Sequence, residues 1–224
     1  MTMATFVLIH GAGDAGWYWH LVEQELRQRG HDTLAPDLPC DDDSAGLAEY
    51  TDTVVAAIGS RRRLIVVAQS FGGFTAPLVA ARVPVEMLVL VTAMLPAPGE
   101  SPDDWPVNTG FGEVMGQQEQ RYSGGDRFYQ DVPPALADQA RRHARDQSGT
   151  PGHAPWPLDG WPPVATRFVL CTEDRFFPPE FMRRVVASRL GVVPDEIAAG
   201  HTVALSRPKE LASLLVSYLP DHLQ

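Results

Sequence analysis

A single serine is expected to lie between an apolar strand and a helix. Five small or branched apolar residues and a glutamine precede Ser70, and Gly72 and Gly73 follow closely. A serine on such a sharp turn is strained, so the residues packed beside it must be almost free of side chain. The stretch 68–72, AQSFG, has the small-x-Ser-x-small form of a nucleophile elbow, and it predicts that Ser70 attacks a carbonyl carbon.

A serine hydroxyl is a poor nucleophile and needs a base to remove its proton. His201 is the candidate, because it follows Gly200 at the end of a short expected strand. Of the seven histidines, it alone combines a late position, a strand end and a preceding glycine. We therefore predict that His201 is the general base for Ser70.

An acid must orient the base, and three acidic residues compete for this role. Glu173 and Asp174 follow the expected strand 167–172, and Asp195 precedes the next short strand. We favour Asp174 because it lies one step further into the loop, where its carboxylate can bend back toward Nδ1 of the histidine. Glu173 is then expected to be a structural partner of the following loop.

Two backbone N–H groups are expected to stabilise the charge that develops on the carbonyl oxygen. Phe71 N–H is one of them, by its position after the serine. The loop 10–13, HGAG, follows the first expected strand, 5–9, and Ala12 N–H is the natural second donor. The side chain of His10 is expected to hold this loop by hydrogen bonds rather than to act in catalysis.

The same loop also matches the dinucleotide-binding fingerprint. Residues 11–16 have the form G-x-G-x-x-G after a strand, and Asp37 lies 21 residues beyond Gly16, at the place of the ribose-binding acid. This alternative is weaker, because the aromatic residues 17–19 crowd a pyrophosphate site and the serine, acid and histidine stay unexplained. No Tyr-x-x-x-Lys occurs, since Lys209 is the only lysine. No Walker loop, H-E-x-x-H or zinc-type spacing occurs either, so no metal is predicted.

Strands and helices are expected to alternate along the chain. The expected strands are 5–9, 32–38, 64–69, 87–93, 167–172 and 196–199. The expected helices are 17–29, 45–58 with Ser44 as N-cap, 74–83, 179–190 and 208–219. This alternation predicts an α/β fold, with a mostly parallel sheet of about six strands and helices on both faces. Functional loops of such sheets lie at the carboxyl ends of the strands, where all the candidate residues fall.

Residues 97–164 interrupt this alternation. They are rich in Pro, Gly, Gln and Trp, with weak helical patterns near 111–120 and 134–147. Such an insertion is too long for a featureless loop, so we predict a small helical cap over the active site. The core then consists of 1–96 and 165–224, in a single structural domain. Large apolar side chains are expected to pack the cap onto the core, and the candidates among them for substrate contact are Trp105, Phe111, Phe128, Tyr129 and Trp156.

Composition and charge narrow the classes of partner. The chain has 224 residues, 44% hydrophobic and 21% charged, as in an ordinary globular protein. Its net charge of −10 argues against nucleic acid or an anionic membrane as the main partner. No apolar run approaches the roughly 20 residues of a membrane span, and no signal peptide is expected. Cys40 and Cys171 lie far apart in the sequence, so we expect a reduced, cytoplasmic protein. The expected partner is a small-molecule substrate.

Four segments together resemble the α/β-hydrolase superfamily, most closely its compact branch of plant methylesterases, hydroxynitrile lyases and bacterial relatives. The segments are FVLIHGAG…GWYW from Phe6, AQSFGG from Ala68, CTEDRFFPPEF from Cys171 and GHT…LSRP from Gly200. The resemblance covers nearly the whole chain except the cap. It implies an α/β-hydrolase fold without a cofactor, and the roles given above to Ser70, His201, Asp174 and the two backbone N–H groups.

Two departures from that branch bear on the reaction. The lyases carry a threonine after the first-loop histidine and a lysine after the catalytic histidine, where this chain has Gly11 and Thr202. Without the lysine nothing obvious stabilises a leaving cyanide, which favours hydrolysis. We therefore expect a cofactor-independent serine hydrolase, an esterase or lactonase, that acts on a small, fairly apolar carboxylic ester through an acyl-enzyme. The alternatives are a ligand-binding or signalling protein, or a lyase, on the same fold with little hydrolysis.

Overall fold

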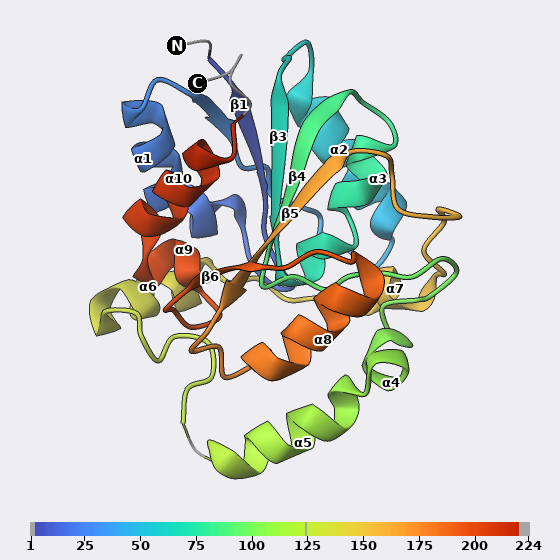
Figure 1. Ribbon diagram of the computed structural model, residues 1–224, viewed down its shortest axis with the longest axis vertical. Coiled ribbons are helices and arrows are strands. Elements are labelled where there is room, and N and C mark those ends of the chain that lie inside the picture. Colours follow the sequence, from blue (N-terminus) through green and yellow to red (C-terminus); the bar gives the residue numbers. More distant parts are fainter. Residues whose placement is uncertain (1–2, 124, 220–224) are drawn as a thin grey trace.

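A parallel β-sheet runs through the centre of the protein in the computed structural model, which describes residues 3–123 and 125–219 (Figure 1). Its six strands are ordered β2-β1-β3-β4-β5-β6, and each neighbouring pair is parallel. The strands are β1 (Thr5–Ile9), β2 (Asp32–Leu34), β3 (Leu64–Gln69), β4 (Val85–Val91), β5 (Ala165–Cys171) and β6 (Asp195–Ile197). The predicted sheet of about six mostly parallel strands is confirmed.

The strand order creates a crevice at the carboxyl edge of the sheet. The chain passes from β1 to β2 on one side, and then returns to place β3 on the other side of β1. The connections that leave β1 and β3 therefore diverge toward opposite faces, and a crevice of this kind is where α/β sheets bind ligands. Ser70 and the glycine-rich loop after Ile9 meet there.

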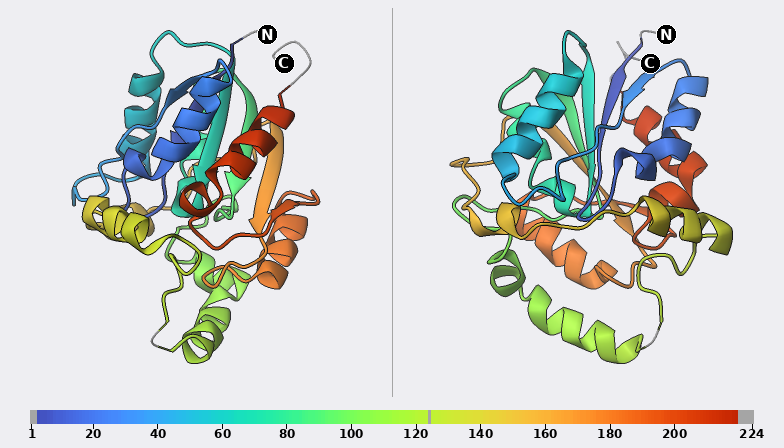
Figure 2. Two further views of the ribbon diagram at one scale, coloured as in Figure 1. Left: turned by 90° about the vertical axis from the view of Figure 1, so that its left-hand side faces the viewer. Right: turned by 180° about the vertical axis from the view of Figure 1, so that it is seen from behind.

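Apolar side chains fill both faces of the sheet. All residues of β1 and β3 are buried, because helices cover both faces and leave no side for polar residues. Alternate residues point to opposite faces, so Val66 packs in one core and Val67 in the other. One face carries α1 (His20–Gln28), α9 (Val203–Ser206) and α10 (Pro208–Ser217). The other face carries α2 (Leu47–Ile58), α3 (Ala76–Ala80) and α8 (Pro179–Arg189) (Figure 2).

Helix α2 starts differently from the prediction. It begins at Leu47, and the backbone N–H of Gly46 donates to the Glu49 carboxylate (2.8 Å). Ser44 instead bonds with Asp42 in the preceding turn. The prediction of a Ser44 cap is wrong because the glutamate at the third helical position completes the first turn from within the helix.

The described part of the segment between β4 and β5 forms four helices beside the carboxyl edge of the sheet (Figure 1). They are α4 (Trp105–Thr109), α5 (Phe111–Arg121), α6 (Pro134–His143) and α7 (Thr150–His153). Two indoles attach this segment to the core: Trp105 Nε1 donates to Leu95 O (3.0 Å), and Trp156 Nε1 donates to Phe74 O (3.1 Å). Each ring therefore buries a large apolar surface without leaving its N–H unpaired.

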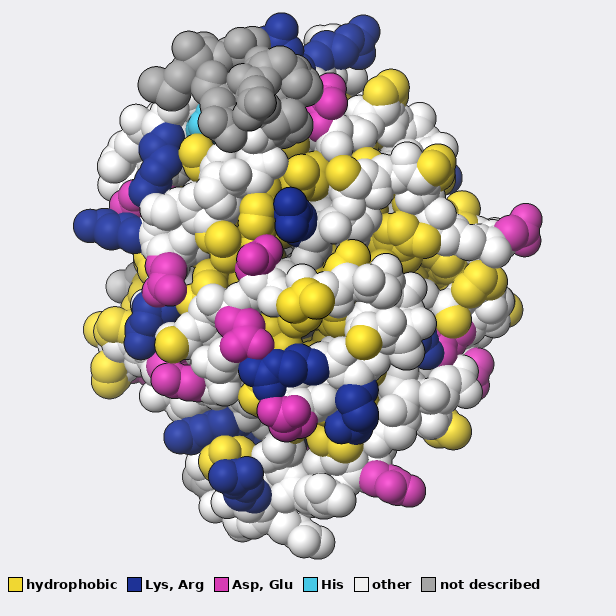
Figure 3. All heavy atoms as spheres, viewed as in Figure 1, with side chains coloured by type: hydrophobic (Ala, Val, Ile, Leu, Met, Phe, Trp, Pro, Cys, Tyr) yellow, Lys and Arg dark blue, Asp and Glu magenta, His cyan; other side chains and the backbone are white. Residues whose placement is uncertain are grey.

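The exterior mixes charges of both signs. Acidic and basic side chains alternate with apolar ones over the face shown in Figure 3. None of the helices within 3–123 and 125–219 combines the length and apolar character needed to cross a bilayer.

Both cysteines are buried and free, and burial raises the pKa of the Cys171 thiol, which keeps it protonated inside the core.

A buried ion pair joins the start of the segment 97–164 to α8. Arg189 donates to both carboxylate oxygens of Glu100 and to the carbonyl of Leu95. Asn108 Nδ2 also donates to Glu100 (2.9 Å). Burial alone would raise the pKa of the Glu100 carboxyl, but the hydrogen bonds from Arg189 and Asn108 outweigh it and lower the pKa.

Removing the charge of Glu100 is expected to destabilise the fold. Glu100→Gln leaves the Arg189 guanidinium, whose side chain is 15% exposed, without its counter-ion. We expect the free energy of unfolding to fall by about 3 kcal/mol, measured by urea denaturation. The matched control is Asp138→Asn, which breaks an exposed pair with Arg141 and should cost less than about 1 kcal/mol. Equal losses in the two variants would contradict the prediction.

Candidate active site

Ser70 lies at the turn from β3 into the 3₁₀ helix η2 (Ser70–Gly73), in a left-handed backbone conformation. Its φ of 52° is rare and strained for a residue with a side chain. A Cβ on Gly72 would lie 2.8 Å from His10 O, and one on Gly73 would lie 1.9 Å from Met94 O. The glycines expected beside the serine are thus explained by the close approach of two other backbone segments.

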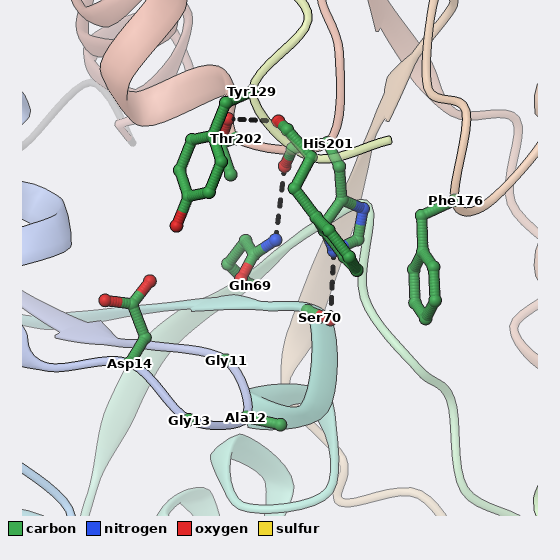
Figure 4. Close-up of a pocket in the computed structure, with 11 residues that line it drawn as sticks. Gly11, Ala12, Gly13, Asp14, Gln69, Ser70, Tyr129, Phe176, His201 and Thr202 are labelled. Carbon is green, nitrogen blue, oxygen red and sulfur yellow. Dashed lines mark hydrogen bonds between the residues drawn. The ribbon is translucent and has the colours of Figure 1, made fainter. Parts of the chain in front are cut away.

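Three of the predicted side chains form a hydrogen-bonded chain at this turn. His201 Nε2 lies 3.1 Å from Ser70 Oγ, and His201 Nδ1 lies 2.8 Å from Asp174 Oδ2. Figure 4 shows the contact between Ser70 and His201. The three residues follow β3, β5 and β6, so the parallel sheet brings them together at one edge although up to 131 residues separate them.

Four donors surround the Asp174 carboxylate. Oδ1 accepts the backbone N–H groups of residues 176–177 (2.8 and 2.9 Å), and Oδ2 accepts the Thr92 hydroxyl (2.6 Å) as well as His201. A carboxylate offers only acceptors, so Nδ1 of His201 carries the hydrogen. Nε2 then presents its lone pair to the hydroxyl of Ser70.

The two competing acids lie away from the histidine ring. The Asp195 carboxylate accepts the hydroxyl of Tyr218 (2.6 Å). The Glu173 side chain is exposed, while its carbonyl accepts a hydrogen bond from Gln130 Nε2 (3.1 Å). Asp174 is therefore the acid that the structure places against His201.

The side chain of His10 connects two loops beside the serine. Nε2 accepts the Leu38 N–H (3.0 Å), so the hydrogen lies on Nδ1, which donates to Gly11 O (2.8 Å). Burial lowers the pKa of His10 to about 4, and the ring is neutral at physiological pH. These bonds confirm that His10 supports the first loop.

The two backbone N–H groups predicted for the oxyanion border the same turn. Ala12 lies in the wall of the cavity beside Ser70, and among the described residues no acceptor contacts its N–H. Phe71 is the second residue of η2, and the first N–H groups of a helix have no partner within it. Both N–H groups are thus left for a ligand.

A cavity of about 230 Å³ opens beside Ser70 (Figure 4). Its walls are formed by Gly11, Ala12, Gly13, Asp14, Gln69, Ser70, Phe128, Tyr129, Phe176, His201 and Thr202. Phe128 and Tyr129 are among the predicted substrate contacts, whereas Asp14, Gln69 and Phe176 were not predicted. All three lie within two residues of a predicted site residue or loop, and that proximity in the sequence is the signal that could have found them.

The other three predicted substrate contacts lie outside the cavity wall. Trp105 is 0% and Trp156 1% exposed, and both indoles bond to backbone carbonyls of the core. Phe111 packs against Phe177, with ring centroids 4.9 Å apart. Trp105, Phe111 and Trp156 thus pack the inserted segment onto the core, as expected of its large apolar side chains, and do not line the cavity beside Ser70.

A loop of the inserted segment, residues 126–132, holds the loop that carries His201. Gly200 N–H donates to Asp131 Oδ2 (2.7 Å), and the Thr202 hydroxyl donates to Phe128 O (2.6 Å). A Cβ on Gly200 would lie 2.6 Å from Asp131 Oδ1, so a larger residue there would displace the Asp131 side chain. The position of His201 therefore depends on the inserted segment.

The glycine-rich loop lines this cavity at its start and packs against the next loop at its end. Residues 11–13 line the cavity, and Asp37 Oδ1 accepts the Gly16 N–H (2.7 Å). A Cβ on Gly16 would lie 2.0 Å from Ala35 O, so contact with the next loop requires the last glycine. In the described ranges no group of three or more His, Cys, Asp or Glu side chains could hold a metal ion.

A model of the alpha/beta hydrolase family matches residues 6–214. The chain belongs to this family. The resemblance noted in the sequence, and the fold that it implies, are thereby confirmed.

Relatives of this alpha/beta hydrolase match it over almost their whole length. Norfluorocurarine synthase 1 of Strychnos sp is 26% identical over 252 residues, which cover 94% of this chain and 93% of the relative. Esterase PIR7B of Oryza sativa subsp. japonica is 27% identical over 254 residues, which cover 94% of each chain. A crystal structure of polyneuridine aldehyde esterase superposes with a TM-score of 0.82 at 21% identity, covering 96% of this chain and 99% of that one.

Acid is expected to destabilise the hydrolase through His10. Its pKa of about 4 in the fold lies below the ordinary 6.5, so between these values the unfolded chain binds a proton that the folded chain does not. Stability therefore falls as the pH drops through this window, by roughly 3 kcal/mol in all. Urea denaturation from pH 7 to pH 4 measures this loss, and His10→Gln, which does not titrate, should show a shallower pH dependence. Identical slopes for the two proteins would contradict the prediction.

Proposed function

We propose that the protein is a cofactor-independent serine hydrolase that cleaves a small, fairly apolar carboxylic ester or lactone. The observation that carries this proposal is the hydrogen-bonded chain from Ser70 through His201 to Asp174 in the wall of a cavity. The esterase names of polyneuridine aldehyde esterase, Esterase PIR7B and Methylesterase 9 among the relatives support the enzyme class.

Acylation begins when Ser70 Oγ attacks the ester carbonyl carbon. His201 Nε2 takes the hydroxyl proton, and the Asp174 carboxylate stabilises the imidazolium that forms. The carbonyl oxygen becomes an oxyanion, which Ala12 N–H and Phe71 N–H stabilise by hydrogen bonds. When the tetrahedral intermediate collapses, the alkoxide leaves with the proton from His201, and an acyl group remains on Ser70.

Deacylation repeats the same steps with water. His201 Nε2 takes a proton from a water molecule, whose oxygen attacks the acyl carbon. The second tetrahedral intermediate uses the same two backbone N–H groups. Its collapse returns the proton to Ser70 Oγ and releases the carboxylic acid.

The surroundings of the serine favour hydrolysis over cyanohydrin cleavage. The place of the lysine that the lyases carry is taken by Thr202, whose hydroxyl already donates to Phe128 O (2.6 Å). A Cβ on Gly11 would lie 2.6 Å from Gln69 Oε1, so a threonine does not fit there without movement. Neither position supplies a group that would stabilise a leaving cyanide.

The nucleophile is tested by Ser70→Ala. Hydrolysis of p-nitrophenyl acetate should fall by a factor on the order of 10⁴ or more, because no other group forms the acyl-enzyme. A fluorophosphonate should add once to the wild type and not to the variant, as measured by intact mass. Ser60→Ala, at an exposed serine, is the matched control and should keep both the adduct and the activity. Turnover by Ser70→Ala within a few-fold of the wild type would refute the proposal.

The loop 126–132 is expected to affect turnover through His201. Asp131→Ala removes the acceptor of Gly200 N–H and loosens the loop that carries the histidine. We expect kcat to fall by roughly tenfold to a hundredfold with a smaller change in KM, since an ångström of misplacement has effects of this size. Asp146→Ala, at an exposed carboxylate of the same segment, is the control. A change confined to KM would mean that Asp131 does not position His201.

A further inference from the structure

One carboxyl group in the wall of the cavity has no basic partner. Asp14 lines the cavity together with Ser70 and His201. Its Oδ1 accepts the Ala15 N–H (2.8 Å), and within the described residues no donor contacts Oδ2. Figure 4 shows the carboxyl group of Asp14 pointing into the cavity, on the side where the hydroxyl of Tyr129 also lies.

The basic side chains nearest this end of the cavity are already engaged. Arg145, whose backbone N–H donates to Gly13 O, uses its guanidinium to bind Asp41 (2.6 Å) and Leu38 O (2.7 Å). Arg141, which lies 5.0 Å from the centroid of the Tyr129 ring, binds Asp126 and Asp138. Neither arginine, nor any lysine, is among the described residues that line the cavity. No arginine or lysine among the described residues therefore pairs with Asp14, and its Oδ2 is left available to a cationic group of a ligand.

Aromatic rings form much of the remaining wall. Phe128, Tyr129 and Phe176 all line the cavity. The faces of such rings attract cations, and a carboxylate beside them adds a hydrogen-bond acceptor of opposite charge. The net charge of −10 of the whole chain also favours the approach of a cation over that of an anion.

We propose that Asp14 forms a subsite for an ammonium group, and that the protein hydrolyses esters that carry a positively charged nitrogen. This inference rests on the proposed function, since it names the substrate class of the same site. The charged nitrogen lies beside Asp14 Oδ2, and the ester carbonyl lies beside Ser70. The rest of the substrate is apolar and contacts Phe128 and Phe176.

The electrostatics of Asp14 agree with this assignment. Burial raises the pKa of the Asp14 carboxyl to about 6, and the nearby carboxylate of Asp37 contributes to the rise. The group is still ionised at pH 8, so its charge is held in a poorly solvated place. A neutral hydroxyl would bond to Oδ2 but would leave the charge uncompensated, whereas an ammonium group, protonated or quaternary, compensates the charge.

Isosteric ester pairs at pH 8 test the subsite. Methyl 4-(trimethylammonio)butanoate and methyl 5,5-dimethylhexanoate differ only in the charge of the acyl part. Choline butanoate and 3,3-dimethylbutyl butanoate differ only in the charge of the alcohol part. For each pair, the measured quantity is the kcat/KM of the cationic ester divided by that of the neutral ester. We expect wild type to prefer the cationic ester in one pair, and Asp14→Asn to lower this ratio by roughly tenfold to a hundredfold. Asp43→Asn removes one charge from an exposed side chain and should leave the ratio unchanged.

A binding measurement separates the subsite from the reaction. Butyltrimethylammonium should bind to Ser70→Ala, and binding should be lost in the double variant Ser70→Ala/Asp14→Asn, as measured by saturation-transfer NMR. This result without hydrolysis of any ester would support the subsite and overturn the proposed function. Two outcomes would overturn the ammonium subsite even if Ser70 proves to be the nucleophile. One is that Asp14→Asn leaves the ratio of kcat/KM values unchanged in both ester pairs. The other is that the single and double variants bind butyltrimethylammonium equally.

Discussion

The geometry of the site depends on how closely other backbone segments approach the turn at Ser70. The serine is held at a φ of 52°, a conformation that persists only when its surroundings leave no alternative. Carbonyl groups of His10 and Met94 provide these surroundings, since they lie where side chains of Gly72 and Gly73 would be. The same approach brings the loop after β1 against the serine, so that strain at one residue and the assembly of two site loops have one cause.

A second constraint fixes the orientation of the His201 ring. The four donors on Asp174 come from its own loop, from Thr92 after β4 and from His201 after β6. Each donor stabilises the ionised carboxylate. Together the four hydrogen bonds prevent the carboxylate group from rotating away from His201. The imidazole is therefore oriented by three consecutive strands of the sheet, and a rigid sheet holds it better than a single flexible loop would.

The sequence predicted the parts of the protein that short motifs determine. Strand periodicity, the glycines around Ser70 and the order of serine, acid and histidine are local signals, and the fold and the proximity of these residues followed from them. Thr92 carried no such signal, because its hydrogen bond to Asp174 arises from the register of neighbouring strands. Asp14 was marked only by its proximity in the sequence to the loop 10–13. The sequence did not separate Trp105 and Trp156 from the rings of the cavity wall, because aromatic composition does not distinguish a ring that packs a segment from one that lines a cavity.

The inserted segment affects the site through a loop rather than through its helices. Helix α4 and the start of α5 pack on α8 through Trp105 and Phe111. Residues 126–132 instead supply two of the aromatic rings in the cavity wall, and the acceptors that hold Gly200 and Thr202. The same short loop thus forms part of the cavity wall and holds the loop that carries His201. Asp14 lies outside this loop, in the wall formed by the segment after β1, and makes no hydrogen bond to His201 or to residues 126–132.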